Sequence, residues 1–567
     1  MKFNDYKYER PDIELAEKET EELLGKFKEA DGAEAQVDVL NKINQIRSRV
    51  STMMDLCYIR HTVNTNDPFY KQEQDYIDEI SPKMEGIASR INEALLSSAF
   101  RKELEAIFGK QLFQLAEAQV KTFSNEVLPL LEKENKLSSQ YTQLVASAQI
   151  EFQGDTLTLA QLEPFTESAD RSVRRQATRA RFAFFAEHEK QFDAIYDELV
   201  KVRTGIARKL GFKNFVELGY YRLNRVDYNS DMVKGYREQI KEFIVPLANK
   251  LRKAQQKQTG LKELKFHDES YQFTTGNAKP KGPAEWIIEN GKKMYEELSP
   301  ETAEFFQFML DHDLMDLEAK KGKAGGGYCT YVSDYRSPFI FSNFNGTSGD
   351  IDVLTHEAGH AFQVYSSRDF TVPEFLWPTY EACEIHSMSM EFFTWPWMEL
   401  FFKEDTDKYK YAHLSGAILF LPYGAAVDEF QHRVYEQPGL TPEERKTVWK
   451  EIEQVYLPHR DYDGIPYLEA GGFWQRQGHI YEVPFYYIDY TLAQVCALQF
   501  WKRMNEDREE AWKDYVKICK IGGSLSFTEI VEQAGLHSPF EEGCIKKVIE
   551  PIERWLDQAG QELIDSI

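Results

Sequence analysis

The chain has 567 residues, of which 42 % are hydrophobic and 28 % are charged. This balance is typical of a folded globular protein and excludes a disordered chain. The formal net charge of −25 disfavours binding to nucleic acids and to anionic membranes, because both carry negative charge themselves.

Two further features concern the cellular environment. The first ten residues lack the apolar core of a secretory signal, and no stretch approaches the roughly 20 apolar residues of a membrane span. The six cysteines are scattered singly, with no C-x-x-C pair. These observations predict a cytoplasmic protein with reduced thiols.

The first 230 residues predict a nearly continuous succession of helices. Ala, Glu, Lys, Leu and Gln dominate from about residue 12 onwards, and proline is rare. Apolar residues recur three or four positions apart in the ranges 13–27, 35–46, 83–100 and 113–131. Residues 149–158 instead alternate between apolar and polar, which predicts a small hairpin.

Residues 170–181 form a strongly basic stretch with five arginines. Such a stretch could bind a peptide carboxylate or an acidic partner. A helix face whose charges are solvated and paired with nearby Asp and Glu explains the pattern better, because most charge runs have that role. Another helix follows over 232–258, and Pro283 is placed to begin a further one.

The composition changes at Gly325-Gly-Gly-Tyr328. The three glycines do not form a phosphate loop, because no G-K-[ST] follows in register. The ranges 328–335 and 338–346 are β-branched and aromatic, and they predict the one convincing sheet of the chain. An edge strand of such a sheet could bind an extended peptide as an additional strand.

A helix over 350–365, with Asp350 as its expected N-cap, carries the motif His356-Glu-Ala-Gly-His360. Residues four apart share one face of a helix, so His356 and His360 can bind one metal ion. Glu357 lies beside them, where its carboxylate can act as a general base on a water molecule. The spacing therefore predicts the site of a zinc hydrolase.

A catalytic zinc ion needs a third protein ligand. A second predicted helix, over 377–393, offers four candidates: Glu381, Glu384, His386 and Glu391. Glu384 is central on the face that it shares with Glu381 and Glu391, so it is the first choice. Glu391 or Ser387 would then orient the ligands through hydrogen bonds.

These segments resemble the thimet oligopeptidase and oligoendopeptidase F family of zinc peptidases, especially its oligoendopeptidase F/Pz-peptidase branch. The resemblance rests on three segments: Gly325-Gly-Gly-Tyr-Cys329, His356 to Glu391 with its two motifs, and Gly478-His-Ile-Tyr-Glu-Val-Pro-Phe-Tyr-Tyr-Ile-Asp-Tyr490. It implies that Glu384 is the third ligand of one Zn²⁺ ion.

The resemblance also implies roles for the third segment, in which a His and several Tyr contact the substrate and the reacting carbonyl. His479 matches that His. Tyr486 and Tyr490 keep the four-residue interval of the family's tyrosines, and Tyr487 is the alternative.

The fold implied by the resemblance is mainly α: a two-lobed helical ellipsoid with a deep central channel and a small β-sheet beside the zinc helix. We expect residues 1–200 to form an N-terminal helical lobe and residues 201–567 to form the zinc peptidase catalytic domain.

The predicted function is zinc-dependent hydrolysis of internal bonds in short, unfolded oligopeptides, with Glu357 as general base. Two alternatives remain. One is a helical zinc exopeptidase, either a carboxypeptidase or a dipeptidyl carboxypeptidase, and the other is a non-catalytic peptide-binding scaffold with structural zinc. Glu357 argues against the scaffold, since structural zinc needs no base. The expected partners are oligopeptides, and the oligomeric state stays open.

Overall fold

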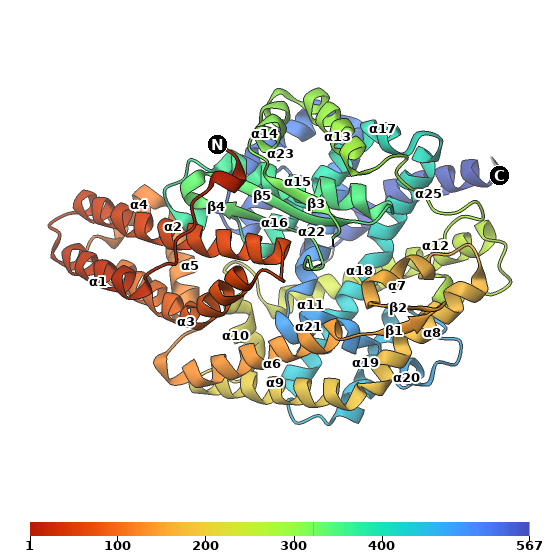
Figure 1. Ribbon diagram of the computed structural model, residues 1–567, viewed down its shortest axis with the longest axis horizontal. Coiled ribbons are helices and arrows are strands. Elements are labelled where there is room, and N and C mark those ends of the chain that lie inside the picture. The colour runs from red at the N-terminus through yellow and green to blue at the C-terminus, as the bar shows by residue number, and fades with distance from the viewer. Residues whose placement is uncertain (321, 566–567) are drawn as a thin grey trace.

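The computed structural model describes residues 1–320 and 322–565 (Figure 1). Helices make up 72 % of the protein, and two small sheets complete it, so the predicted mainly α fold is confirmed. Within the described ranges, none of the helices is both long enough and apolar enough to cross a bilayer.

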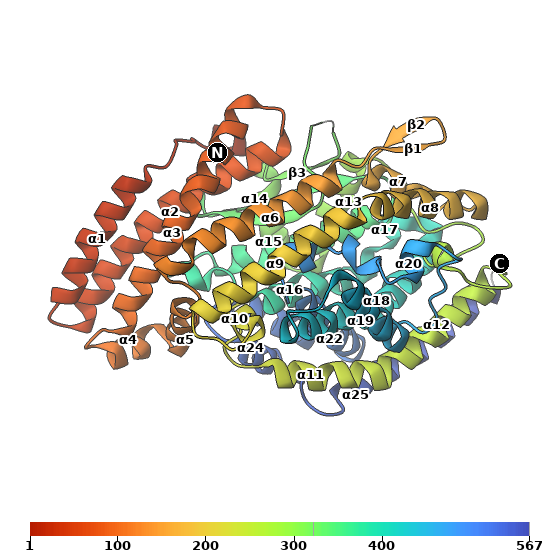
Figure 2. The same ribbon diagram turned by 90° about the horizontal axis from the view of Figure 1, so that it is seen from below.

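Five helices form one end of the molecule, as both ribbon views show (Figures 1 and 2). They are α1 (Ile13–Glu29), α2 (Ala33–Val63), α3 (Pro68–Leu96), α4 (Arg101–Phe108) and α5 (Lys110–Val120). The prediction of one helix over 113–131 is wrong in one respect, because the helical segment is interrupted between Val120 and Leu128. Pro129 lies in the first turn of the next helix, a position that proline favours because it needs no N–H partner.

The middle of the chain continues the helical succession. Its helices are α6 (Leu128–Ala146), α7 (Leu159–Thr166), α8 (Arg171–Glu187), α9 (Glu189–Lys209), α10 (Phe215–Arg222), α11 (Ser230–Gln239), α12 (Val245–Gln258), α13 (Ala284–Leu298) and α14 (Pro300–Asp311). The predicted division of the chain at residue 200 stays a prediction. Residue 200 itself lies inside α9, which is continuous across it.

The C-terminal half supplies the remaining helices. They are α15 (Gly349–Ser367), α16 (Tyr380–Phe393), α17 (Glu399–Phe402), α18 (Thr406–Glu436), α19 (Pro442–Tyr456), α20 (Pro466–Glu469), α21 (Gly478–Glu482), α22 (Tyr487–Glu506), α23 (Arg508–Ile521), α24 (Phe527–Gln533) and α25 (Cys544–Asp565). The last helix, α25, ends at Asp565, and residues 566–567 lie outside the described part.

Both sheets are small. β1 (Ile150–Phe152) and β2 (Asp155–Leu157) form the predicted hairpin. Its turn residues Gln153 and Gly154 both have positive φ, as a two-residue hairpin turn requires. The second sheet has the order β3-β5-β4 and contains β3 (Met315–Glu318), β4 (Tyr328–Val332) and β5 (Ser337–Phe344). The sequence did not predict β3, which pairs in parallel with β5. The strand β4 lies at the edge, antiparallel to β5.

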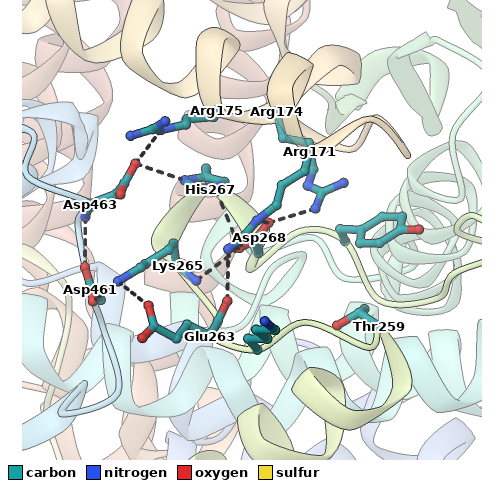
Figure 3. A network of polar contacts seen from close by, with 12 residues as sticks. Arg171, Arg174, Arg175, Thr259, Glu263, Lys265, His267, Asp268, Asp461 and Asp463 are labelled. Carbon is teal, nitrogen blue, oxygen red and sulfur yellow. Dashed lines mark hydrogen bonds and ion pairs between the residues drawn. The ribbon is translucent and has the colours of Figure 1, made fainter.

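The basic stretch of α8 forms ion pairs within the protein (Figure 3). Arg171 and Arg174 each contact a carboxylate oxygen of Asp268 at 2.7 Å, and Arg175 contacts Asp463 at 2.6 Å. Burial raises the pKa of Asp268, but the bonds from the two arginines outweigh this and lower it. The predicted pairing is therefore confirmed, although Arg174 is buried rather than solvated.

The helices α15 and α16 approach each other unusually closely. A Cβ atom on Gly359 of α15 would lie 2.6 Å from the Cα of Ser387 and 2.7 Å from the carbonyl oxygen of His386, both on α16. Only glycine fits there without displacing backbone atoms. The contact brings the first motif of the sequence against the second.

The start of α15 differs from the prediction that Asp350 is its N-cap. The helix begins at Gly349, so Asp350 is already its second residue. The Asp350 carboxylate accepts the backbone N–H groups of Asn345 and Gly346, both at 2.8 Å. It therefore stabilises the loop that leads from β5 into the helix, instead of the first turn of the helix itself.

Replacing Gly359 with alanine tests this helix contact. The added methyl group overlaps backbone atoms of α16, so we expect Gly359→Ala to lower the stability by about 1–3 kcal/mol through overpacking. Thermal unfolding monitored by circular dichroism measures the change. Gly235→Ala in α11 is the matched control, because a Cβ there meets nothing within 4 Å. The control should be neutral or stabilising by up to about 1 kcal/mol; equal effects of the two substitutions would contradict the packing argument.

Candidate active site

Three side chains from α15 and α16 converge at one point. Within the described residues, His356, His360 and Glu384 are the one group of His, Cys, Asp or Glu that could hold a metal ion, with donor atoms all within 4.8 Å of one another. The Oε2 atom of Glu384 lies 3.2 Å from Nε2 of His356 and 3.4 Å from Nε2 of His360. Of the candidates for the third position, Glu384 is thus the one that the structure brings to the two histidines.

These separations fit a tetrahedral metal ion. Ligand bonds of about 2.0–2.2 Å at tetrahedral angles leave neighbouring donor atoms roughly 3.4 Å apart. The donor set of two imidazole nitrogens and one carboxylate oxygen is typical of catalytic zinc and leaves a fourth position open. The residues present therefore fit a zinc ion.

A chain of hydrogen bonds orients His356. Its Nδ1–H donates to Oε1 of Glu391 at 2.7 Å, and Nε2–H of His413 donates to the other oxygen of Glu391 at 2.7 Å. The indole N–H of Trp395 in turn donates to Nδ1 of His413 at 3.0 Å. The bond to Glu391 keeps the proton of His356 on Nδ1, so that Nε2 presents its lone pair to the metal position.

The Glu384 carboxylate is fixed from two further sides. The Ser387 hydroxyl donates to its Oε2 at 2.9 Å, and the Tyr486 hydroxyl donates to its Oε1 at 2.8 Å. Burial raises the pKa of Glu384, but the neighbouring His360 and His356 hold it well below its ordinary value. The carboxylate is therefore ionised and held in position, as a metal ligand must be. Both expected orienting residues, Glu391 and Ser387, contact the three-residue group.

The other two candidates for the third position lie elsewhere. Glu381 is buried near Asp489 and Arg225; burial and the Asp489 charge raise its pKa, which favours a neutral carboxyl. His386 donates from Nδ1 to the carbonyl of Ala382 at 2.7 Å, and burial lowers its pKa to about 4. Neither residue reaches the group formed by Glu384 and the two histidines.

Glu357 lies in the wall of the same cavity as the three candidate ligands. Its side chain is 7 % exposed, and burial raises its pKa against the opposing effect of His356 and His360. A carboxylate with a raised pKa accepts a proton more readily, as a general base must. Gly327, directly before β4, lies beside this carboxylate: a Cβ on it would be 3.5 Å from Oε1 of Glu357.

His479 is held as a neutral hydrogen-bond donor. The Tyr423 hydroxyl donates to Oε1 of Gln477 at 2.9 Å, which turns the amide nitrogen of Gln477 to Nδ1 of His479 at 2.8 Å. Since Nδ1 accepts, the proton of the imidazole resides on Nε2. Burial lowers the pKa of His479, which keeps the ring uncharged.

The three tyrosines of the third motif surround His479. The ring centroids of Tyr487, Tyr486 and Tyr490 lie 4.9, 5.7 and 5.7 Å from the imidazole centroid. Tyr486 and Tyr490 line the cavity that holds the candidate ligands, whereas Tyr487 lines a neighbouring one. Burial and the Glu384 charge raise the pKa of both Tyr486 and Tyr490, so both phenols keep their protons and can donate them in hydrogen bonds.

The site lies between two cavities. The first, of about 690 Å³, contains His356, Glu357, His360 and Glu384 in its wall, and Ala88 and Gln111 of the N-terminal helices line it as well. The second cavity has a volume of about 600 Å³. Its wall contains Glu391 of the second motif, the Glu391 partner His413, and His479 and Tyr487 of the third motif. Tyr490 lines both cavities. The two cavities therefore adjoin at Tyr490, on either side of the third motif.

Four residues of this arrangement were not predicted: Trp395, His413, Gln477 and Tyr423. His413 lies on α18, a different helix from its partner Glu391, and no motif marks it. Gln477 and Tyr423 are likewise far apart in the sequence and meet only in the fold. Gln477 directly precedes the Gly478 motif, which is the one local signal that could have drawn attention to it.

The fold and this site define a class: a helical metallopeptidase with two histidines and a glutamate on adjacent helices. The comparison with family models agrees. Residues 3–123 match the peptidase M3 N-terminal domain, and residues 164–549 match peptidase family M3. The chain belongs to peptidase family M3.

Individual relatives share most of this architecture. A solved structure of Pz peptidase A with an inhibitor is 62 % identical, with a TM-score of 0.95 over 98 % of this chain and 99 % of that one. A structure described as an oligoendopeptidase F from Bacillus anthracis is 59 % identical, with a TM-score of 0.91 over 98 % of both chains. The oligoendopeptidase F homolog of Borreliella burgdorferi is 24 % identical over 70 % of this chain and 69 % of that protein.

The choice between Glu384 and Glu381 can be tested by metal content. We expect Glu384→Ala to lose most of its bound metal, because one of three protein ligands is removed. Glu381→Ala should retain its metal, since Glu381 lies outside the donor group. Mass spectrometry of metals in the purified variants measures both. Metal loss in Glu381→Ala alone would show that Glu381, rather than Glu384, is the third metal ligand.

Proposed function

We propose that this protein is a zinc-dependent oligoendopeptidase that hydrolyses internal bonds of short, unfolded peptides, with one zinc ion per chain. The observation that carries the proposal is the grouping of His356, His360 and Glu384 with their donor atoms within 4.8 Å of one another, and Glu357 in the same cavity wall. The relatives named oligoendopeptidase F and Pz peptidase A support the endopeptidase assignment.

In the proposed mechanism, Glu357 moves the proton. His356, His360 and Glu384 would hold the zinc ion, which would lower the pKa of a water molecule and polarise the substrate carbonyl. The Glu357 carboxylate accepts a proton from the attacking water and later donates it to the leaving amine. Its raised pKa supports both steps, because a carboxylate that is too acidic would not take up the proton.

His479, Tyr490 and Tyr486 are the proposed donors to the oxyanion that forms at the attacked carbonyl. Tyr490 is the stronger candidate of the two tyrosines, because it lines both cavities. The hydroxyl of Tyr486 already donates to Glu384 and would have to leave that carboxylate. The Nε2–H of His479 is available, since its proton is fixed by Gln477 on the opposite nitrogen.

The substrate would bind in an extended form along β4. This strand is at the edge of its sheet, and Gly327, Tyr328 and Cys329 line the cavity of the candidate ligands. Unpaired backbone groups of an edge strand can add a peptide as a further strand. The six free cysteines support a cytoplasmic location, and the net charge of −25 argues against nucleic acid as a partner.

An exopeptidase is the competing function. Such an enzyme needs a group that binds the charged end of its substrate. Arg47 lines the first cavity, but its guanidinium is already paired with Glu374 at 2.5 Å. This pairing favours the endopeptidase, because an internal bond needs no cation for a terminal carboxylate.

Replacing the base by an amide tests the mechanism. Glu357→Gln keeps the shape of the side chain but cannot accept the proton, so we expect turnover to fall by at least about 100-fold while bound metal is retained. Cleavage of an internally quenched peptide gives the rate, and metal analysis gives the occupancy. Cleavage close to the wild-type rate would sink the assignment of Glu357 as the base.

Chelation and end-blocking test the reaction class. We expect a chelator to abolish cleavage and added Zn²⁺ to restore it, because the proposed nucleophile is a water molecule activated by the metal. A peptide acetylated at its N-terminus and amidated at its C-terminus should still be cut internally. Mass spectrometry of the products identifies the cut bond. Release of terminal residues only, and only from unblocked peptides, would establish the exopeptidase instead.

A further inference from the structure

A third cavity of about 370 Å³ continues from the cavity of the metal site. The two share four lining residues: Ala88, Asn92, Gln119 and Tyr380. Because they share walls, we treat the third cavity as an extension of the channel and call it the distal recess. The helices α3, α6 and α10 and the segment 482–484 supply most of its wall, and the three helices lie in the same part of the molecule in Figure 1.

Two large apolar side chains of the distal recess are left open to water. Tyr380 is 46 % exposed and Val483 is 39 % exposed, and both belong to the small set of strongly exposed large apolar residues in the described ranges. Phe123, Leu131 and Pro484 line the same recess. An exposed apolar surface inside a concave site is unfavourable in water and is stabilised when an apolar ligand covers it.

The charged residues of the recess have an acidic excess. Glu85, Glu134 and Glu482 line it, against one arginine. That arginine, Arg222, is paired with Glu134 at 3.0 Å. No other cation among the lining residues is left to pair with Glu85 and Glu482. An acidic side chain entering the recess would therefore be repelled, whereas an apolar one would meet Tyr380 and Val483.

Tyr380 connects the recess to the reaction site. Its ring centroid lies 5.0 Å from that of Tyr486, whose hydroxyl donates to Glu384. Tyr486 lines the first cavity, and Tyr380 lines both the first cavity and the recess. A peptide that extends from the candidate metal ligands past Tyr380 would therefore stay in contact with the protein until it reaches the recess.

We propose that the distal recess is a specificity subsite that binds an apolar side chain of the peptide substrate, remote from the bond that is cut. This inference rests on the proposed oligoendopeptidase function and adds a determinant of peptide length and sequence to it. Peptides long enough to place a leucine in the recess bind more tightly than shorter ones, and glutamate at that position is disfavoured.

The test uses Val483, because it has no ring contact with the tyrosines of the reaction site. Its backbone N–H and carbonyl form hydrogen bonds with His479 and Tyr486 that a side-chain substitution leaves in place. Val483→Ser removes the apolar surface, and Val483→Trp fills the recess. Val455→Ser on α19 is the matched control: Val455 is 50 % exposed and lines none of the described cavities.

The substrates are internally quenched peptides that share one cleavage site and grow by one residue at a time at either end, with Leu, Ser or Glu as the added residue. For wild type we expect a fall in KM, with kcat unchanged, at the length where leucine enters the recess. Val483→Ser should raise KM about five- to tenfold for these peptides only, as loss of one apolar contact predicts. Val483→Trp should make long peptides no better than short ones, and Val455→Ser should match wild type.

The proposal is overturned if wild type shows no preference for leucine at any length, or if Val483→Ser slows the shortest and the longest peptides equally. Failure of the underlying function looks different. In that case the shortest peptide is not cleaved by wild type, or it is cleaved equally well by Glu357→Gln.

Discussion

The close contact of α15 with α16 is the constraint on which the candidate site depends. Two of the three donors lie on α15 and the third on α16, so the distance between the helices decides whether they can meet. Packed helix axes are ordinarily 8–10 Å apart. At Gly359 there is no room for even a methyl group against Ser387, which lies one turn beyond Glu384. Because Gly359 of the first motif has no side chain, the two helices can approach closely. This approach brings the carboxylate of Glu384, in the second motif, to the two histidines.

Buried charge sets the second constraint, because an ionised group inside a protein is tolerated only with partners. Glu391 satisfies it by accepting hydrogen bonds from His356 and His413, which lie on two different helices. The same rule explains the basic stretch of α8, where the buried pair of Arg174 and Asp268 joins segments far apart in the chain. Paired charges of this kind connect elements of the fold, which is why a run of arginines need not mark a binding surface.

Local patterns of the sequence predicted the features that depend on residues close together in the chain. The spacing of His356, Glu357 and His360 placed two candidate donors and a candidate base on one helix, and the alternation in 149–158 predicted a hairpin. The pattern could not predict contacts between distant elements, because periodicity shows which face is buried but not which neighbour covers it. His413 and the strand β3 were missed for this reason. The cap assigned to Asp350 was wrong because a carboxylate can satisfy backbone N–H groups of a preceding loop as well as those of a helix start.

Reaction class and substrate selection are encoded in different parts of this chain. The donors and the base require fixed side chains at fixed spacing, so they leave a recognisable motif between His356 and Glu391. Peptide recognition requires only a long surface of suitable shape and polarity, which many sequences can provide. Much of the cavity wall that we propose for this role comes from α3, α5 and α6, where no motif occurs. A sequence can therefore predict the bond that is hydrolysed while it leaves the preferred peptide undetermined, and the shape of the channel walls has to supply that part.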